Sequence, residues 1–174
     1  MITFRPLDLV TDRLALSRLD TSFTTDRIYC LEQTAHACRL VESQVTPAVQ
    51  KAYRLDDLAT LDWVLAAAND ADLLGLVALR VETWNGRAIL HHVYVTAGAR
   101  GNGIGRTLVE AAAAEATRRR ARVLWTETQT VNYGAVQFYE RVGFVWCGFD
   151  TSLYDPSVVS AGEKALFFER SLTS

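Results

Sequence analysis

The chain has 174 residues, 49% of them apolar and 22% charged, with a formal net charge of −2. Such a composition is ordinary for a soluble globular protein and is long enough for one α/β domain with a substantial core. The small net charge gives no general attraction to nucleic acid or to an anionic membrane, so neither is expected as a partner.

The three cysteines are Cys30, Cys38 and Cys147. An odd number without a C-x-x-C pair argues against a disulfide framework and against a zinc site, so no metal is expected. We expect them to be small buried hydrophobes in a reducing compartment. The first residues lack a basic segment followed by an apolar run, and no window approaches ~18 uninterrupted apolar residues, so a cytoplasmic location is predicted.

In the first half of the chain, residues 1–24 predict only a peripheral lead-in. Residues 25–45 alternate β-branched and aromatic residues with polar ones, which predicts extended structure and favours a hairpin, and Pro47 either ends it or places it at an edge. Asp56 or Asp57 is expected to cap a helix that closes near residues 68–69. Its apolar residues recur at helical spacing: Leu58, Leu61, Val64 and Leu65.

Residues 73–82 and 88–96 predict two antiparallel strands, because Asn85-Gly86 between them accepts the positive φ angles of a tight turn. A glycine-rich loop precedes a helix that ends in Arg118-Arg119-Arg120. One apolar face is expected on this helix, formed by Ile104, Leu108, Ala111, Ala112 and Ala116. The arginine run is interpreted as a solvated helix C-terminus rather than a nucleic-acid patch, because cations there oppose the macrodipole.

A short strand is predicted over residues 123–128, followed by a helix marked by Ala135, Phe138 and Val142 and stopped by Gly143. Residues 144–154 and 164–170 are predicted to be the last strands. The chain shows no internal repeat and no linker, which favours a single domain over residues 1–174.

The loop after the second strand of the hairpin carries glycines at positions 98, 101, 103 and 105. The helix that follows leaves several backbone N–H groups without intrahelical partners, and its N-terminus carries partial positive charge. Together with Arg100 or Arg106, such a loop suits a pyrophosphate. A P-loop needs Gly-Lys-Ser/Thr and a dinucleotide loop needs G-x-G-x-x-G; neither is present, so NTP and NAD are runner-up ligands. The remaining alternative is a tight strand-to-helix connection.

The chain resembles the GNAT superfamily of N-acetyltransferases from about residue 73 to residue 170. The motif R/Q-x-x-G-x-G/A is matched by Arg100, Gly103 and Gly105. The motif N-x-x-A-x-x-F-Y followed by Gly-Phe is matched by Asn132, Ala135, Phe138, Tyr139, Gly143 and Phe144. Residues 1–50 show little that can be matched.

Within the superfamily the chain resembles the streptothricin acetyltransferases. The residues that carry this likeness are Trp84-Asn85, Glu127-Thr128-Gln129, Asp150-Thr151, Leu153-Tyr154 and Glu163-Lys164-Ala165. Those enzymes usually carry an acidic pair where this chain has His91-His92. The resemblance therefore predicts the identity of the acyl donor better than that of the acceptor.

The resemblance implies an α/β (α+β) GNAT fold, with a mixed, mostly antiparallel sheet, a central splayed parallel strand pair and flanking helices. It implies acetyl-CoA as cosubstrate, its pantetheine paired with backbone at Val93, Tyr94 and Val95 and contacted by Asn132. The pyrophosphate is expected on the loop formed by Arg100, Gly101, Asn102, Gly103, Ile104, Gly105, Arg106 and Thr107.

For catalysis, Tyr139 is the family-matched donor of a proton to the departing thiolate, with core packing as the alternative. Histidine suits the base, since its reference pKa is about 6.5. His91 and His92 are expected on opposite faces of their strand, and His91 is favoured because it shares a face with Val93. Ordinary half-buried histidines are an equally good interpretation, and Glu127 is the alternative base, an ammonium-binding group or a structural carboxylate.

Three functions follow. The first is acetyl-CoA-dependent acetylation of a primary amine, with a streptothricin-like or other small-molecule amine as the sharpest version. The second keeps the mechanism but acts on a protein or peptide. The third is a coenzyme A binding module that has lost catalysis. The sequence does not decide between a monomer and a homodimer.

Overall fold

The computed structural model describes residues 1–55, 57–160 and 162–172. The chain forms two compact units. The first contains residues 1–22, 52–125 and 170–174, and the second contains residues 23–51 and 126–169. The two GNAT-like motifs of the sequence lie in different units. The glycine loop belongs to the first unit, and the Asn132–Phe144 segment belongs to the second.

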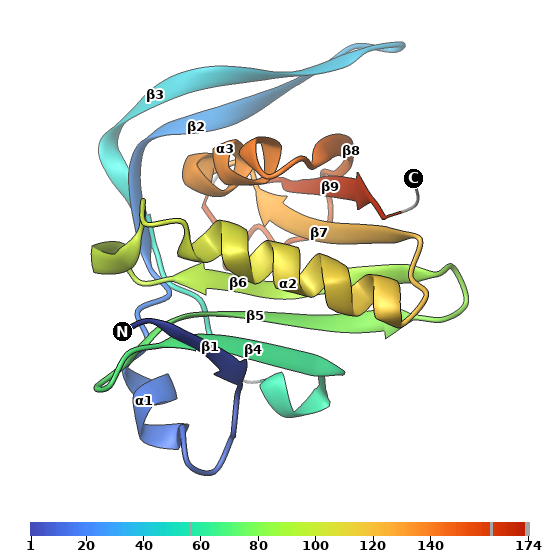
Figure 1. The fold of residues 1–174 in the computed structure, drawn as a ribbon. Helices are drawn as coiled ribbons and strands as arrows, with labels where there is room; N and C mark the ends of the chain where they lie inside the picture. The colour runs from blue at the N-terminus through green and yellow to red at the C-terminus, as the bar shows by residue number, and fades with distance from the viewer. Residues whose placement is uncertain (56, 161, 173–174) are drawn as a thin grey trace. The chain divides into compact units, whose positions relative to one another are not determined.

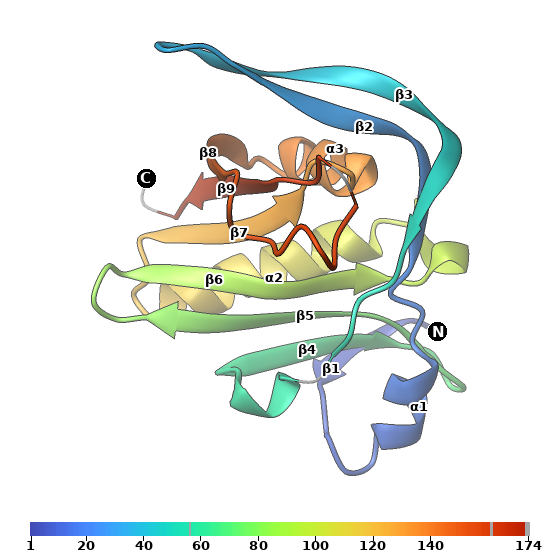
Figure 2. The ribbon, with the colours of Figure 1, turned by 180° about the vertical axis from the view of Figure 1, so that it is seen from behind.

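The first unit is built on a sheet with the strand order β1 (Thr3–Pro6), β4 (Trp63–Ala68), β5 (Leu73–Glu82) and β6 (Arg87–Val95), seen from both sides in Figures 1 and 2. These strands pair antiparallel with their neighbours. The predicted hairpin is confirmed, because β5 and β6 join through Gly86 at a φ of 65°.

The helix α2 (Ile104–Arg118) follows β6 and leads to β7 (Val123–Gln129), which is next to β6 in the strand order and runs parallel to it (Figure 1). In Figures 1 and 2, α2 lies across one face of β5 and β6. Its buried side includes Ile104, Leu108 and Ala112, as the apolar spacing predicts. Glu115 is also buried on this helix, and its carboxylate accepts hydrogen bonds from Arg118 and Arg119.

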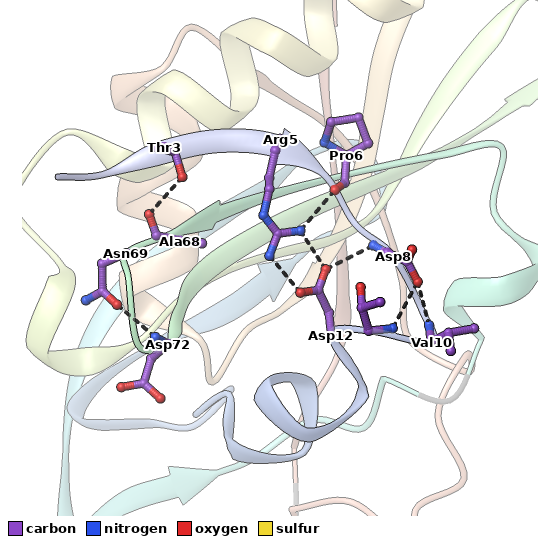
Figure 3. A network of polar contacts seen from close by, with 10 residues as sticks. Thr3, Arg5, Pro6, Asp8, Val10, Asp12, Ala68, Asn69 and Asp72 are labelled. Carbon is purple, nitrogen blue, oxygen red and sulfur yellow. Dashed lines mark hydrogen bonds and ion pairs between the residues drawn. The ribbon is translucent and has the colours of Figure 1, made fainter.

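The N-terminal residues hold more structure than the lead-in that the sequence predicted. They form β1 and the helix α1 (Arg13–Arg18). Figure 3 shows the turn between them, where Arg5 donates two hydrogen bonds to Asp12 at 2.7 and 2.6 Å. Asp12 also accepts a bond from the backbone N–H of Asp8 (Figure 3). The bidentate pair thus fastens the start of α1 to β1.

The helix predicted from Asp56 or Asp57 to residues 68–69 is wrong. The structure has a short 3-10 helix at Leu58–Thr60 and then the strand β4. β4 has partners on both sides, β1 and β5, and Ala66–Ala68 are buried. A strand buried on both faces shows no polar alternation, so its apolar run resembles a helical face.

The second unit contains a long antiparallel ribbon of β2 (Phe23–Gln33) and β3 (Cys38–Lys51), which confirms the predicted hairpin. β3 continues through Pro47, so Pro47 does not end it; in a two-stranded ribbon both strands are edges. The ribbon packs on α3 (Tyr133–Arg141), where Tyr29 and Tyr133 stack with ring centroids 5.3 Å apart.

The sheet of the second unit has the order β7, β9 (Ala165–Ser171) and β8 (Val145–Asp150), with β8 and β9 antiparallel. Asn132 caps α3 by accepting a hydrogen bond from the N–H of Ala135 at 3.1 Å. The helix is followed by Gly143 at a φ of 89°, as the sequence predicted. Phe168 and Val136 are fully buried in this unit.

The cysteines depart from the prediction, because Cys30, Cys38 and Cys147 are all free and exposed rather than buried. Cys30 follows the buried Tyr29 on β2, so the alternation of a strand turns its side chain outward. Across residues 1–55, 57–160 and 162–172, no helix is long and apolar enough to cross a membrane, and no group of three or more potential ligand side chains forms a metal site.

Candidate functional site

The glycine loop of the first unit has the backbone that its sequence predicted. Gly101 and Gly103 adopt φ angles of 82° and 79°, which favour glycine, and Gly103 is the N-cap of α2. The first helical bond is donated by the Thr107 N–H to the Gly103 carbonyl at 3.0 Å. The N–H groups of Ile104 and Gly105 lie before that bond and point out of the helix end.

The loop has room for an anion. A Cβ built at Gly98, Gly101 or Gly103 would meet no described atom within 4 Å. Arg100 braces the loop from within, because its guanidinium donates to the carbonyls of Val95 at 2.8 Å and Ser22 at 2.5 Å. The N–H of Thr107 is already used in the helix, and the N–H of Arg100 donates to the Ala97 carbonyl at 3.3 Å, so these two predicted loop residues have backbone donors that are committed elsewhere.

The strand β6 leads directly into this loop. Val93 and Val95 pair with Val77 and Gly75 of β5. A Cβ at Gly75 would lie 2.4 Å from the Tyr94 carbonyl, so glycine lets β5 and β6 approach at this point. β6 is therefore held on its β5 side along the residues predicted to face pantetheine.

The prediction that His91 and His92 lie on opposite faces is wrong. Ala78 of β5 pairs with His92 and Leu79 pairs with Leu90, so His91 is an extra residue in β6. Such a β-bulge breaks the alternation of side chains. Both rings turn to one carboxylate: His92 Nε2 lies 2.5 Å from Asp57 Oδ1, and His91 Nδ1 lies 3.9 Å from Asp57 Oδ2.

The electrostatics of this cluster favour a charged Asp57. Burial acts to raise the pKa of Asp57, but its hydrogen bond to His92 and its electrostatic attraction to both histidines hold the pKa below the usual value. Burial, followed by the charge of Arg80, lowers the pKa of His91. At neutral pH the cluster therefore contains an ionised carboxylate beside His92 and a neutral His91.

Tyr139 lies in the interior of the second unit, 7% exposed, among the rings of Phe138, Phe144 and Phe168. Its hydroxyl accepts a hydrogen bond of 3.4 Å from Thr126. Burial raises the pKa of Tyr139 to about 12. The phenol therefore keeps its proton at neutral pH, as a proton donor must.

Glu127 is the centre of a polar cluster at the end of β7 in the second unit. It accepts hydrogen bonds from the Tyr154 hydroxyl and, at 3.2 Å, from Gln129. Burial raises the pKa of Glu127 above its usual value. Next to it, Lys51 forms an ion pair with Glu163, whose side chain is 1% exposed, and lies 5.9 Å from the centre of the Tyr154 ring.

The sequence singled out Glu127, but it gave no role to four residues that join it in this cluster: Gln129, Tyr154, Glu163 and Lys51. The first three had been noted as points of resemblance, so the signal was present without its geometry. Asp57 was missed as a site residue, because its sequence context suggests a helix cap. Asn132 is the N-cap of α3. Its contact with the cosubstrate stays a prediction.

Comparison with known proteins gives one consistent result. The family model described as Acetyltransferase (GNAT) family matches residues 27–144. A streptothricin acetyltransferase from Streptomyces lavendulae is 35% identical over 167 residues, covering 90% of this chain and 88% of the relative.

Among solved structures, a nourseothricin acetyltransferase matches with a TM-score of 0.88 and 34% identity, covering 99% of each chain. A candidate streptothricin acetyltransferase from Bacillus anthracis, solved in complex with acetyl coenzyme A, matches with a TM-score of 0.85. Its identity is 23%, with 98% of this chain and 99% of that one covered, so this likeness supports the fold alone.

Proposed function

Because the chain belongs to the GNAT family of acetyltransferases and is an acetyl-CoA-dependent N-acetyltransferase, we propose that it acetylates a primary amine of a streptothricin-like antibiotic. Two relatives that cover most of the chain are named for this class of antibiotic or for nourseothricin. The observation in the structure that carries the proposal is Glu127, a half-buried carboxylate that Tyr154 and Gln129 orient by hydrogen bonds and that suits an ammonium group. Such a site favours a polycationic small molecule.

We assign acetyl-CoA binding to the first unit. The cosubstrate's pyrophosphate fits the N–H groups from Gly101 to Arg106, where the open glycine loop meets the positive end of α2. Arg100 supports that site by bracing the loop. Backbone groups of Val93, Tyr94 and Val95 suit the pantetheine arm, and Asn132 is proposed as a further contact.

In the proposed reaction, a neutral amine attacks the thioester carbonyl, the C–N bond forms and the C–S bond breaks. A backbone N–H near Val93 would stabilise the oxyanion, an interaction whose loss typically costs ~3 kcal/mol. Tyr139 donates its proton to the departing thiolate. The proton of the amine goes to a base of the His91-His92 pair, predicted as His91, with Glu127 as the alternative.

For Glu127 we favour the ammonium-binding role. Its carboxylate is already a hydrogen-bond acceptor for Tyr154 and Gln129, which hold it in one orientation. A second cationic group of the acceptor would give it a charged donor. The ion pair between Lys51 and Glu163 fixes the neighbouring loop before β9.

We further propose that residues 1–174 act as one acetyltransferase domain, since the two GNAT motifs lie in different units. A cytoplasmic location is supported by the exposed free cysteines, which persist as thiols in a reducing compartment. Nucleic acid and membranes are not proposed as partners, and a homodimer is left open to measurement.

A screen of acceptors tests the proposal. Purified protein with acetyl-CoA is given streptothricin, an aminoglycoside, spermidine or a lysine-containing peptide, and free thiol is followed. We expect the highest kcat/KM with streptothricin. Faster turnover of the peptide would favour a protein acetyltransferase, and binding of acetyl-CoA without thiol release from any acceptor would favour a non-catalytic coenzyme A module.

A further inference from the structure

The contact between Asp57 and His92 is a short polar contact on β6 that the sequence did not predict. His92 Nε2 lies 2.5 Å from Asp57 Oδ1, and the His92 side chain is 10% exposed. An ionised carboxylate only accepts hydrogen bonds, so Nε2 carries the proton in this contact. In the tautomer with its proton on Nε2, the imidazole holds a lone pair on its other nitrogen, Nδ1.

Nδ1 of His92, like Nε2 of His91, is a buried atom with no hydrogen-bond partner within residues 1–55, 57–160 and 162–172, and of the two rings only that of His92 is also hydrogen-bonded to Asp57. Buried polar atoms of folded proteins are nearly always hydrogen-bonded, so this lone pair calls for a donor from water or a ligand. The ring cannot turn away easily, because it packs 5.6 Å from the Tyr94 ring, which in turn lies 5.7 Å from the Tyr53 ring.

We propose that His92, rather than His91, takes the proton of the acceptor amine at Nδ1, and that Asp57 is the positioning residue that holds His92 in the tautomer this step needs. The proposal rests on the proposed function, since it assumes an amine acceptor. It deepens that function by assigning the base and a residue that acts through it.

His91 is less suited to the step. Its Nδ1 lies 3.9 Å from Asp57 Oδ2, beyond hydrogen-bond distance, so no carboxylate fixes its tautomer. Its side chain is 25% exposed and is influenced by the Arg80 charge, which disfavours a second positive charge. Arg80 pairs with Glu82 at 3.0 Å on β5. Among the described residues, Asp57, Tyr94 and Tyr53 are further titratable groups near the histidine pair.

The step balances as follows. The amine nitrogen attacks the acetyl carbonyl carbon, a C–N bond forms, and one N–H proton passes to His92 Nδ1 directly or through one water. The imidazolium that results is stabilised by Asp57. The C–S bond breaks, and the thiolate takes a proton from Tyr139. The product is an amide and free coenzyme A, after which His92 returns its proton to solvent and Tyr139 regains one from solvent.

The tautomer is tested without any acceptor. Imidazole nitrogens are ¹⁵N-labelled, and the signals of His36, His91 and His92 are assigned with single His→Gln variants. We expect Nδ1 of His92 to give the signal of an unprotonated nitrogen and Nε2 that of a protonated one, with a mixture of tautomers in Asp57→Asn. A protonated Nδ1 in the parent, or an unchanged tautomer in Asp57→Asn, would overturn the positioning role.

Kinetics test the base. In the parent, kcat/KM should fall at low pH, in part because the base of the enzyme becomes protonated. This enzyme-derived fall, the acidic limb of the profile, should be lost in His92→Gln and kept in His91→Gln. Asp57→Asn should lower kcat ~10-fold or more while the Kd for acetyl-CoA stays within about twofold. Asp72→Asn, which alters an exposed carboxylate of the same unit, is the matched control.

Loss of the limb in His91→Gln with its survival in His92→Gln would overturn the assignment of the base. Calorimetry and thermal melting of each variant separate a defect in chemistry from one in folding. If the parent releases no thiol with any amine, the proposed function fails and the base role fails with it. The nitrogen spectra would still show whether Asp57 fixes the His92 ring, so the two failures are distinguishable.

Discussion

Thr126 Oγ1 donates a hydrogen bond of 3.4 Å to the hydroxyl of Tyr139 in the interior of the second unit. Tyr139 is the acceptor in this contact, so its own proton is not used there. Burial raises the pKa of Tyr139 to about 12, which keeps the phenol protonated at neutral pH. The pair therefore orients a proton donor without consuming its proton.

Tyr139→Phe is expected to lower kcat by ~10²-fold or more, because the hydroxyl acts on the thiolate only as it forms. The KM for acetyl-CoA should change much less, since the ground state does not use that contact. Steady-state kinetics with varied acetyl-CoA measure both constants. A kcat within about twofold of the parent would reduce Tyr139 to core packing.

Gly103→Val is expected to weaken acetyl-CoA binding strongly. Valine at the Gly103 φ of 79° is strained, and its side chain would stand at the N-terminus of α2 where the pyrophosphate is proposed. Gly98→Val is the matched control, because Gly98 lies in the same loop with no described atom within 4 Å of its Cβ. Calorimetric titration of folded protein measures the Kd, and equal affinity in both variants would contradict the assignment of the loop.

Glu127→Gln is expected to raise the KM for a polycationic acceptor more than it lowers kcat, because it removes the charge that binds an ammonium group. The pKa of Glu127 is raised by burial, so the carboxylate protonates at a higher pH than usual as the solution is acidified. Acceptor affinity should therefore fall with falling pH in the parent and stay flatter in the variant. Glu140→Gln, on the exposed side of α3, is the control. A large loss of kcat with an unchanged KM would instead favour Glu127 as the base.

Glu115→Gln tests the electrostatics of α2. Hydrogen bonds from Arg118 and then Arg119, opposed by burial, lower the pKa of Glu115 to about 2 from the usual 4.5. A folded-state pKa below the unfolded value stabilises the protein above pH ~4.5, and this gain is lost as pH falls toward ~2. Because Arg118 is 70% exposed, solvent screens this gain in stability. Urea unfolding should show this gain at pH 7 and a smaller one at pH 3; a constant difference would contradict the ion-pair origin.

The sequence predicts several turns and helix ends in both units well, because their signals are local. The Asn85-Gly86 turn, the glycines before α2 and the stop at Gly143 each act through the φ angles of one or two residues. The segment Trp63–Ala68 was wrongly predicted as part of a helix, because its pairing with β1 and β5 does not follow from its local sequence. Periodicity alone does not separate a doubly buried strand from a helix.

The site shows the same division. Tyr139 and Glu127 were named from motif and resemblance, but the β-bulge at His91 arises from the register between β5 and β6. That register turns His91 and His92 to one side, and the meeting of His92 with Asp57, 35 positions earlier, is a tertiary contact. Likewise Lys51 and Glu163 are 112 positions apart, so their ion pair has no sequence signal.

The central claim is acetyl transfer from acetyl-CoA to an amine of a streptothricin-like acceptor. Its most direct test is mass spectrometry of streptothricin after incubation with the protein and acetyl-CoA, with free thiol counted in the same reaction. We predict one acetyl group on an amine nitrogen for each thiol released, and no transfer without the protein. Streptothricin left unmodified while another amine is acetylated, or thiol released without an acetylated product, would contradict the claim.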